Sequence, residues 1–314
     1  MEKVILLVGP TGVGKTSASL LIARSLHTEI ISSDSMQIYR RMDIGTAKPT
    51  PEERRSVRHH MIDIAEPWEY YSTGEYIWKV QSIISALHGK GKIPLVVGGT
   101  GLYIKAMTRG IFPGPSADRE MRNSLMEEEK QTSGSLHERL KTLDPGAALR
   151  IEPADTRRII RALEVCLKSE RPMTELHEEL TKPLPYDFIK VGITRDRKEL
   201  YGIIDKRVDA MMEQGLLDEV REVVSLIRAR GPLQELEEYP SLQAIGYKEI
   251  ARHLSGELSL DEAVALVKQR SRNYAKRQFT WFRKEEGIRW IDITGLFDPL
   301  EVYKKIEAAL SALL

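Results

Sequence analysis

One glycine-rich segment near the start of the chain has the composition and spacing of a phosphate-binding loop. Residues 9–16, Gly-Pro-Thr-Gly-Val-Gly-Lys-Thr, fit the pattern G-x-x-x-x-G-K-[ST]. Glycines let backbone N–H groups curl around phosphate oxygens, and the start of a following helix adds the positive end of its dipole. Lys15 supplies a point charge, and the Thr16 hydroxyl is a ligand for Mg²⁺. The pattern predicts a phosphate site made of Gly9, Pro10, Thr11, Gly12, Val13, Gly14, Lys15 and Thr16; the alternative is a glycine-rich turn with an incidental lysine.

A single carboxylate is predicted at a strand end beside this loop. ATPases carry a Mg²⁺-linked acid at the end of a second strand. Here the strand predicted at 93–97 is followed by Gly-Gly-Thr-Gly, whereas Asp34 directly follows the strand predicted at 29–33. Asp34 could serve Mg²⁺ or act as a general base, and the alternative is that it only caps the next turn.

A basic and aromatic run lies near the end of the chain. Residues 268–284 hold seven basic and no acidic residues, with four aromatic residues among them. Cations neutralise backbone phosphates and aromatic rings stack on bases, so the run favours RNA contact. The alternative is a solvated helix face with core aromatics, and we expect Phe279 and Phe282 to be buried. A second basic cluster occupies 157–161.

Alternating strands and helices position these motifs. Apolar runs predict strands at 4–8, 29–33, 93–97, 188–193 and 288–293, and apolar spacing predicts helices at 17–26, 72–87 and 205–229. This order predicts an α/β fold, a P-loop NTPase-like doubly wound parallel sheet. Proline-rich segments bracket a stretch with only helical periods. We therefore expect a catalytic core at 1–114 and 188–314, with RNA-binding helices at its end, and an inserted all-helical module at 115–187.

Composition limits the class of protein. The 314 residues are 41% hydrophobic, enough for a large core, and the net charge of +1 means that any RNA-binding surface must come from charge distribution. The lone Cys166 excludes an intrachain disulfide and a Cys-rich zinc site, and we interpret it as a core residue. No apolar run reaches the ~18 residues of a membrane span. We expect a cytoplasmic protein that makes no membrane contact and needs no more than a monomer.

Ten short segments, spread over nearly the whole chain, match one known set of motifs. They are 9–16, 34–37 (Asp-Ser-Met-Gln), 42–49 (Met-Asp-Ile-Gly-Thr-Ala-Lys-Pro), 59–60 (His-His), 98–103 (Gly-Gly-Thr-Gly-Leu-Tyr), 161–164 (Arg-Ala-Leu-Glu), 207–209 (Arg-Val-Asp), 215–219 (Gly-Leu-Leu-Asp-Glu), 244–249 (Ala-Ile-Gly-Tyr-Lys-Glu) and 275–283 (Ala-Lys-Arg-Gln-Phe-Thr-Trp-Phe-Arg). In these segments the chain resembles the bacterial tRNA dimethylallyltransferases, also called tRNA isopentenyltransferases. The P-loop alone is weak evidence for that family, but the combination is specific.

The resemblance implies a reaction and a set of roles. A dimethylallyl group would pass from dimethylallyl diphosphate to N6 of the adenosine 3′-adjacent to the anticodon in tRNA, releasing diphosphate, with Mg²⁺ at Thr16. Asp34 would be the base, and Thr11, Lys15 and Arg207 would act at the diphosphate. The anticodon stem-loop would meet Asp34, Ser35, Met36, Gln37, Thr100, Arg122, Arg157, Arg158, Arg161, Gln243, Gly246, Lys248, Arg272 and Arg277.

Two other functions share some of these features. A P-loop kinase of small metabolites would have the loop, the sheet and a helical lid, but it does not explain the basic run or the missing acid after residue 97. A non-catalytic RNA-binding module that uses the loop as a nucleotide switch leaves Asp34 without a role. His59 and His60 lack partners at ligand spacing, so we interpret them as structural or substrate-lining rather than metal-binding.

Overall fold

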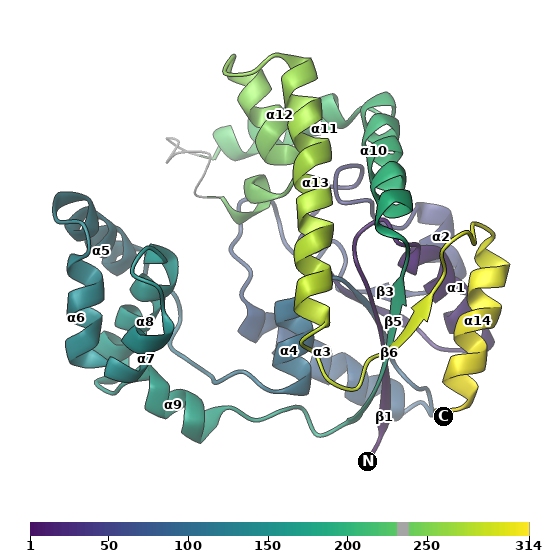
Figure 1. Ribbon diagram of the computed structural model, residues 1–314, viewed down its shortest axis with the longest axis horizontal. Helices are drawn as coiled ribbons and strands as arrows, with labels where there is room; N and C mark the ends of the chain where they lie inside the picture. The colour runs from purple at the N-terminus through teal and green to yellow at the C-terminus, as the bar shows by residue number, and fades with distance from the viewer. Residues whose placement is uncertain (231–238, 314) are drawn as a thin grey trace. The chain divides into compact units, whose positions relative to one another are not determined.

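The computed structural model describes residues 1–230 and 239–313, and its centre is a parallel sheet (Figure 1). Among the described residues six strands pair in the order β3-β2-β4-β1-β5-β6, and every pair is parallel. The strands are β1 (Lys3–Val8), β2 (Ile30–Ser33), β3 (His59–His60), β4 (Leu95–Gly98), β5 (Asp187–Thr194) and β6 (Arg289–Asp292). The predicted α/β class with a parallel sheet is confirmed. Only the two-residue β3 was not foreseen, because it is too short to show a pattern.

The strand β1 is apolar along its length because both of its faces are buried. Val4 to Leu7 are fully buried, as expected for a strand inside a parallel sheet. Ile5 and Leu7 belong to one apolar cluster with residues of α1 (Lys15–Ser25) and α14 (Pro299–Ser311). Tyr76 of α3 (Thr73–His88) stacks on Tyr103 of α4 (Gly101–Thr108) at 3.7 Å between ring centroids. These helices fix the strand ends from which the site is built.

The segment after β5 forms two helices instead of the single one predicted at 205–229. These helices are α10 (Arg197–Glu213) and α11 (Leu216–Arg228). The single-helix prediction is wrong because Gly215 adopts a left-handed conformation with φ of 100°, which ends one helix and starts the next. The remaining elements are α2 (Pro51–Ser56), η2 (Pro240–Gln243), α12 (Tyr247–Leu254) and the long α13 (Leu260–Phe282).

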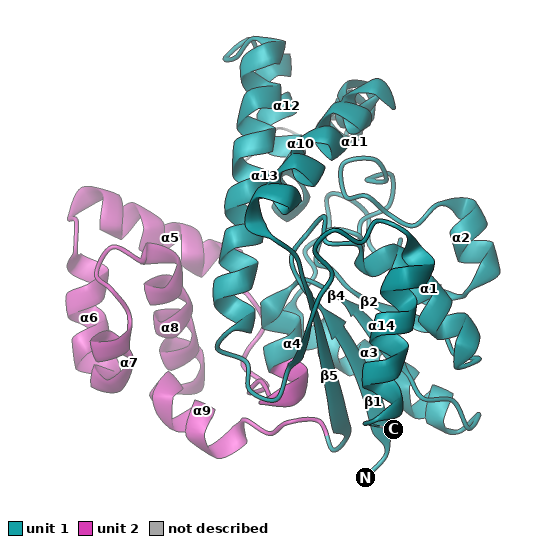
Figure 2. Ribbon diagram, turned by 45° about the vertical axis from the view of Figure 1, so that its right-hand side comes forward, with its two compact units in different colours: residues 1–105, 185–314 teal, residues 106–184 magenta. Residues whose placement is uncertain are grey.

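The chain forms two compact units (Figure 2). Unit 1 comprises Met1–Lys105 and Pro185–Leu314, and unit 2 is Ala106–Leu184, whereas the sequence placed the insertion at 115–187. Unit 2 contains α5 (Arg119–Gln131), α6 (Ser135–Leu143), α7 (Pro145–Arg150), α8 (Thr156–Ser169) and α9 (Met173–Leu180). It has its own apolar core, to which Leu136, Leu140 and Leu163 contribute fully buried side chains. Cys166 is buried in α8, as its apolar neighbours predicted.

No helix in the described part of the chain is long and apolar enough to cross a bilayer.

Candidate functional site

The glycine-rich loop connects β1 to α1 in the geometry that its sequence predicts. Gly9, Gly12 and Gly14 have φ of 150°, 80° and 108°, values that disfavour residues with a Cβ. A Cβ on Gly9 would lie 2.6 Å from the carbonyl oxygen of Ile193 in β5, so this position also needs glycine for space. Since α1 begins at Lys15, the loop presents the first backbone N–H groups of a helix to the adjoining cavity.

Lys15 is held by the loop itself. Its Nζ donates to the carbonyl oxygens of Gly9 and Pro10, at 2.9 and 2.8 Å. Burial lowers the pKa of Lys15 to about 8, while the Asp34 carboxylate raises it and the Arg207 guanidinium lowers it further. An ammonium whose partners among the described residues are only carbonyl oxygens is well placed to bind an incoming anion.

Arg207 reaches the loop from α10. Its Nη2 donates to Thr11 Oγ1 at 2.7 Å, across 196 residues of sequence. Its Nε is buried without a hydrogen-bond partner among the described residues. Burial lowers the pKa of this guanidinium, and the nearby Asp34 carboxylate opposes the shift. A buried donor without a partner is costly, so the geometry favours an anion at this position.

Asp34 directly follows β2, and the structure shows one of the roles considered for it, that of a turn cap. Its Oδ1 accepts the backbone N–H groups of Met36, at 2.8 Å, and Gln37, at 3.3 Å, so the carboxylate does cap the following turn. Its Oδ2 makes no hydrogen bond within the described residues, and that oxygen remains able to take a proton.

One cavity of about 460 Å³ within unit 1 brings these groups together. Lys15, Thr16, Asp34 and Arg207 contribute its polar lining. Apolar side chains also line it, from Ile44, Ala47, Val97, Ile203, Ala210 and Met211. A ligand with a charged end and a short hydrocarbon end matches this lining.

Three segments that the sequence analysis treated separately meet at Glu219, which it did not single out. The Glu219 carboxylate accepts the backbone N–H groups of Asp43, Ile44 and Gly45, at 2.8, 2.8 and 3.0 Å, and the Tyr247 hydroxyl. It thereby fixes the loop 42–49, which lines the cavity. A Cβ on Gly45 would lie 2.5 Å from the Tyr247 ring, so this close approach requires glycine. In the sequence, only the joint presence of the motifs at 42–49, 215–219 and 244–249 could have indicated that these segments meet.

The residues predicted to face RNA in the core form two groups. Near Asp34, Thr100 Oγ1 accepts the N–H of Ser35 at 3.1 Å. The Gln37 amide donates to the carbonyls of Thr46 and Ala47 and accepts the Ser32 hydroxyl, while Met36 packs in an apolar cluster.

The second group lies outside the lining of this cavity. In it, Lys248 Nζ donates to Gln243 Oε1 at 3.1 Å, and Gly246 begins α12 with φ of 98°.

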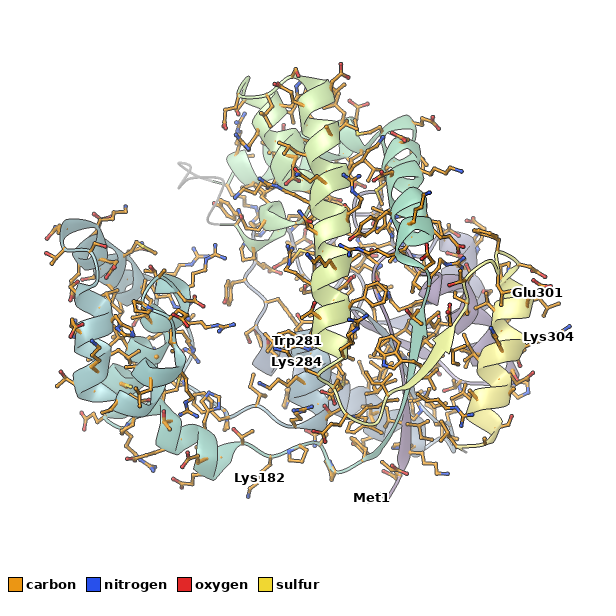
Figure 3. All side chains as sticks on the ribbon, in the orientation of Figure 1. Met1, Lys182, Trp281, Lys284, Glu301 and Lys304 are labelled. Atoms are coloured by element: carbon orange, nitrogen blue, oxygen red, sulfur yellow. The ribbon has the colours of Figure 1, made fainter. Side chains whose placement is uncertain are left out.

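The basic run of α13 divides into paired and exposed cations. Lys268, Arg270 and Arg272 each lie 2.5 Å from a carboxylate oxygen, of Asp209, Glu249 and Asp205 respectively. Arg277 is exposed and lies over the Tyr274 ring, and the exposed Trp281 stands at the end of the helix (Figure 3). Phe282 is fully buried as predicted, but Phe279 is only partly buried.

In unit 2, two of the four predicted RNA contacts serve an internal network. Arg122 and Arg161 both donate to Glu164, whose side chain is fully buried, at distances from 2.5 to 2.9 Å. Although burial opposes it, hydrogen bonds from Arg122, the Asp118 N–H and Arg161 lower the pKa of Glu164. Arg157 and Arg158 are exposed, and Arg158 lies 3.3 Å from Asp155.

The two histidines play different parts. His60 Nε2 lies 2.7 Å from Glu29 Oε2, which ties β3 to the start of β2, and His59 lines the cavity. In the described ranges, no cluster of three or more His, Cys, Asp or Glu side chains could hold a metal ion by itself.

Comparison with known proteins gives a consistent result. The family model for IPP transferase matches residues 37–285, and the model for isopentenyl transferase matches residues 2–66. A tRNA dimethylallyltransferase of Thermodesulfovibrio yellowstonii is 56% identical, over 100% of this chain and 99% of the relative. The protein of the same name from Bacillus subtilis is 44% identical, over 97% and 95%.

Solved structures that resemble this chain carry the same kind of name as its sequence relatives. The tRNA isopentenylpyrophosphate transferase of Bacillus halodurans has a TM-score of 0.70 and 38% identity, over 99% of this chain and 98% of its own. A eukaryotic dimethylallyltransferase acting on tRNA has a TM-score of 0.80 and 30% identity, over 94% of this chain and 75% of its own. The family match covers most of the chain and the relatives match it end to end, so the chain belongs to the IPP transferase family.

Proposed function

We propose that the protein transfers a dimethylallyl group from dimethylallyl diphosphate to N6 of the adenosine 3′-adjacent to the anticodon of tRNA, and releases diphosphate. One observation carries the proposal: the phosphate loop, the carboxylate of Asp34 and Arg207, whose Nε has no hydrogen-bond partner among the described residues, line one cavity that also has an apolar side. The names of the family's members support the same reaction. The residues directly after β4 are Gly99, Thr100 and Gly101, so no carboxylate ends that strand and the kinase alternative gains no support.

The donor's diphosphate would sit on the loop. The N–H groups at the start of α1, Lys15 and Arg207 would bind its oxygens, and Thr11 would keep Arg207 in place. As the bond between the allylic carbon and oxygen breaks, its electron pair leaves with the diphosphate. Fixed positive groups stabilise that growing charge without reorganising.

Asp34 would act on the acceptor. The N6 lone pair is delocalised into the purine, so the nitrogen is a poor nucleophile until a base removes one of its protons. As the new C–N bond forms, that proton would pass to Oδ2 of Asp34. The adenine must leave the base stack to reach a cavity of this kind.

The residues present also fit a Mg²⁺ ion. The Thr16 hydroxyl and the Asp34 carboxylate face the same cavity, and hard oxygen ligands together with substrate phosphates are what Mg²⁺ prefers. Thr16 would hold the ion, which would supply further charge stabilisation to the diphosphate.

The exposed cations are the best candidates for the tRNA grip. Arg277 in unit 1, and Arg157 and Arg158 in unit 2, would neutralise phosphates of the anticodon stem-loop. The reaction as proposed uses groups of one chain and needs no second copy, and tRNA as substrate supports a cytoplasmic location.

A labelling experiment tests the function. The protein is incubated with unmodified tRNA and either dimethylallyl diphosphate labelled in the prenyl group or ATP labelled in the γ-phosphate. We expect label on the RNA only from the prenyl donor, without consumption of ATP. Transfer from ATP, or ADP release in step with RNA modification, would contradict the proposal.

A further inference from the structure

A single buried amide joins the two halves of the site. Gln278, on α13, is 5% exposed. Its Oε1 accepts the backbone N–H of Thr11 at 2.8 Å, and its Nε2 donates to the carbonyl oxygen of Gly99 at 2.9 Å. The side chain therefore links the loop after β1 to the loop after β4. A Cβ on Gly99 would lie 2.2 Å from Nε2, so the backbone packs directly on the amide.

Both hydrogen-bond partners of Gln278, Thr11 and Gly99, are connected to groups that the proposed reaction uses. On the donor side, Thr11 carries the hydroxyl that holds Arg207. On the acceptor side, Gly99 precedes Thr100, whose hydroxyl accepts the N–H of Ser35, the neighbour of Asp34. Tyr274, one helical turn before Gln278, has its hydroxyl beside Thr100 and Gln278.

We propose that Gln278 is a positioning residue that sets the distance between the diphosphate and the Asp34 carboxylate, an inference that rests on the proposed function. An amide offers one acceptor and one donor at the same reach, which is what the Thr11 N–H and the Gly99 carbonyl require. Gln278 lies next to the exposed Arg277, so the helix that would hold RNA also fixes the reacting groups. Its contribution to rate is geometric, because a misplacement of ~1 Å can cost ~10²-fold.

The test replaces the amide by a side chain of similar length. Gln278→Met removes both hydrogen bonds, and Gln269→Met on the exposed side of the same helix is the matched control. For both variants and the wild type we would measure the single-turnover rate at saturating substrates, the KM for tRNA, pyrophosphate affinity without RNA, and the melting temperature.

We expect the single-turnover rate of Gln278→Met to fall by ~10²-fold. Its KM for tRNA should stay within about threefold of the wild type, as expected when only the chemical step is affected. Pyrophosphate should bind it several-fold more weakly, because the Thr11 N–H loses its partner. Gln269→Met should match the wild type throughout.

Two results would overturn the inference. A lower melting temperature with a wild-type rate per folded molecule would make Gln278 a packing residue. A raised KM for tRNA with an unchanged single-turnover rate would make it an RNA contact.

If Gln278→Met does not fold, Tyr274→Phe takes its place, since it removes only the hydroxyl that lies beside Thr100 and Gln278. Its single-turnover rate should fall several-fold at unchanged KM for tRNA, and an unchanged rate contradicts the inference. If the wild type transfers no prenyl group, the proposed function fails instead. Unaltered pyrophosphate affinity in both Gln278→Met and Tyr274→Phe would then overturn the link as well.

Discussion

Two pairs of cations in this molecule look alike in sequence and differ in their surroundings. Arg122 and Arg161 of unit 2 share the buried carboxylate of Glu164. Lys15 and Arg207 of unit 1 contact only carbonyl and hydroxyl oxygens in the part of the chain that the structure describes. The first pair already has a buried carboxylate partner within unit 2, whereas the second pair has no carboxylate partner among the described residues. A cation that shares a buried carboxylate is therefore a poorer binding candidate than one that does not.

The largest effect should follow from removing the carboxylate that lies close to Lys15 and Arg207. Asp34→Ala should reduce turnover by ~10²–10⁴-fold, the usual contribution of a general base. Pyrophosphate affinity should change little, because the loop and its cations hold the anion. Single-turnover rates and calorimetric binding measure the two effects. A near-wild-type rate would show that Asp34 is only the cap of its turn.

The second prediction concerns the free energy of unfolding and a substitution in unit 2. Glu164→Gln keeps the shape of the side chain but leaves Arg122 and Arg161 without their shared charge. We expect a loss of about 2 kcal/mol in the free energy of unfolding, because hydrogen bonds to charged groups are lost in a buried setting. Urea unfolding measures it, with Glu138→Gln as an exposed control in the same unit. Equal stability of both variants would contradict the stabilising role assigned to Glu164.

Some features of the fold and the site could be predicted from the sequence, and others could not. The strands, the phosphate loop and the position of Asp34 could be predicted because each depends on neighbours within a few residues. The partner of Arg122, the role of Glu219 and that of Gln278 could not. These depend on contacts across 174 residues for Glu219 with Gly45 and 267 for Gln278 with Thr11. The break at Gly215 was within reach, since glycine inside a helical pattern is a known warning.

A third effect tests whether Lys15 is held ready for an anion. Its pKa of about 8 means that the ammonium is lost as the pH rises above that value. Pyrophosphate affinity should therefore fall by up to about tenfold between pH 7 and 9. Lys15→Arg keeps its charge over this range and controls for titration of the ligand. Parallel pH profiles of the two proteins would contradict the prediction.

The lowered pKa of Lys15 also makes folding stability depend on pH, in the direction opposite to that of pyrophosphate affinity. The pKa of Lys15 is lower in the folded than in the unfolded chain, so the unfolded state binds more protons between about pH 8 and 10.5. Stability from this group should then rise with pH across that window. Lys15→Met should remove this rise in urea unfolding, and an unaltered rise would assign it to other groups.

The smallest effect compares a paired and an exposed cation on one helix. Arg272 is bound to Asp205, whereas Arg277 is exposed and contacts only the Tyr274 ring among the described residues. A cation that neutralises a phosphate releases roughly one counterion, so the logarithm of affinity falls with the logarithm of salt concentration. Arg277→Ala should flatten that slope for tRNA by somewhat under one unit and weaken all tRNAs alike. Arg272→Ala should leave the slope unchanged and lower the melting temperature. Binding at several salt concentrations decides the matter, and equal slopes for both variants would mean that α13 does not hold the RNA backbone through Arg277.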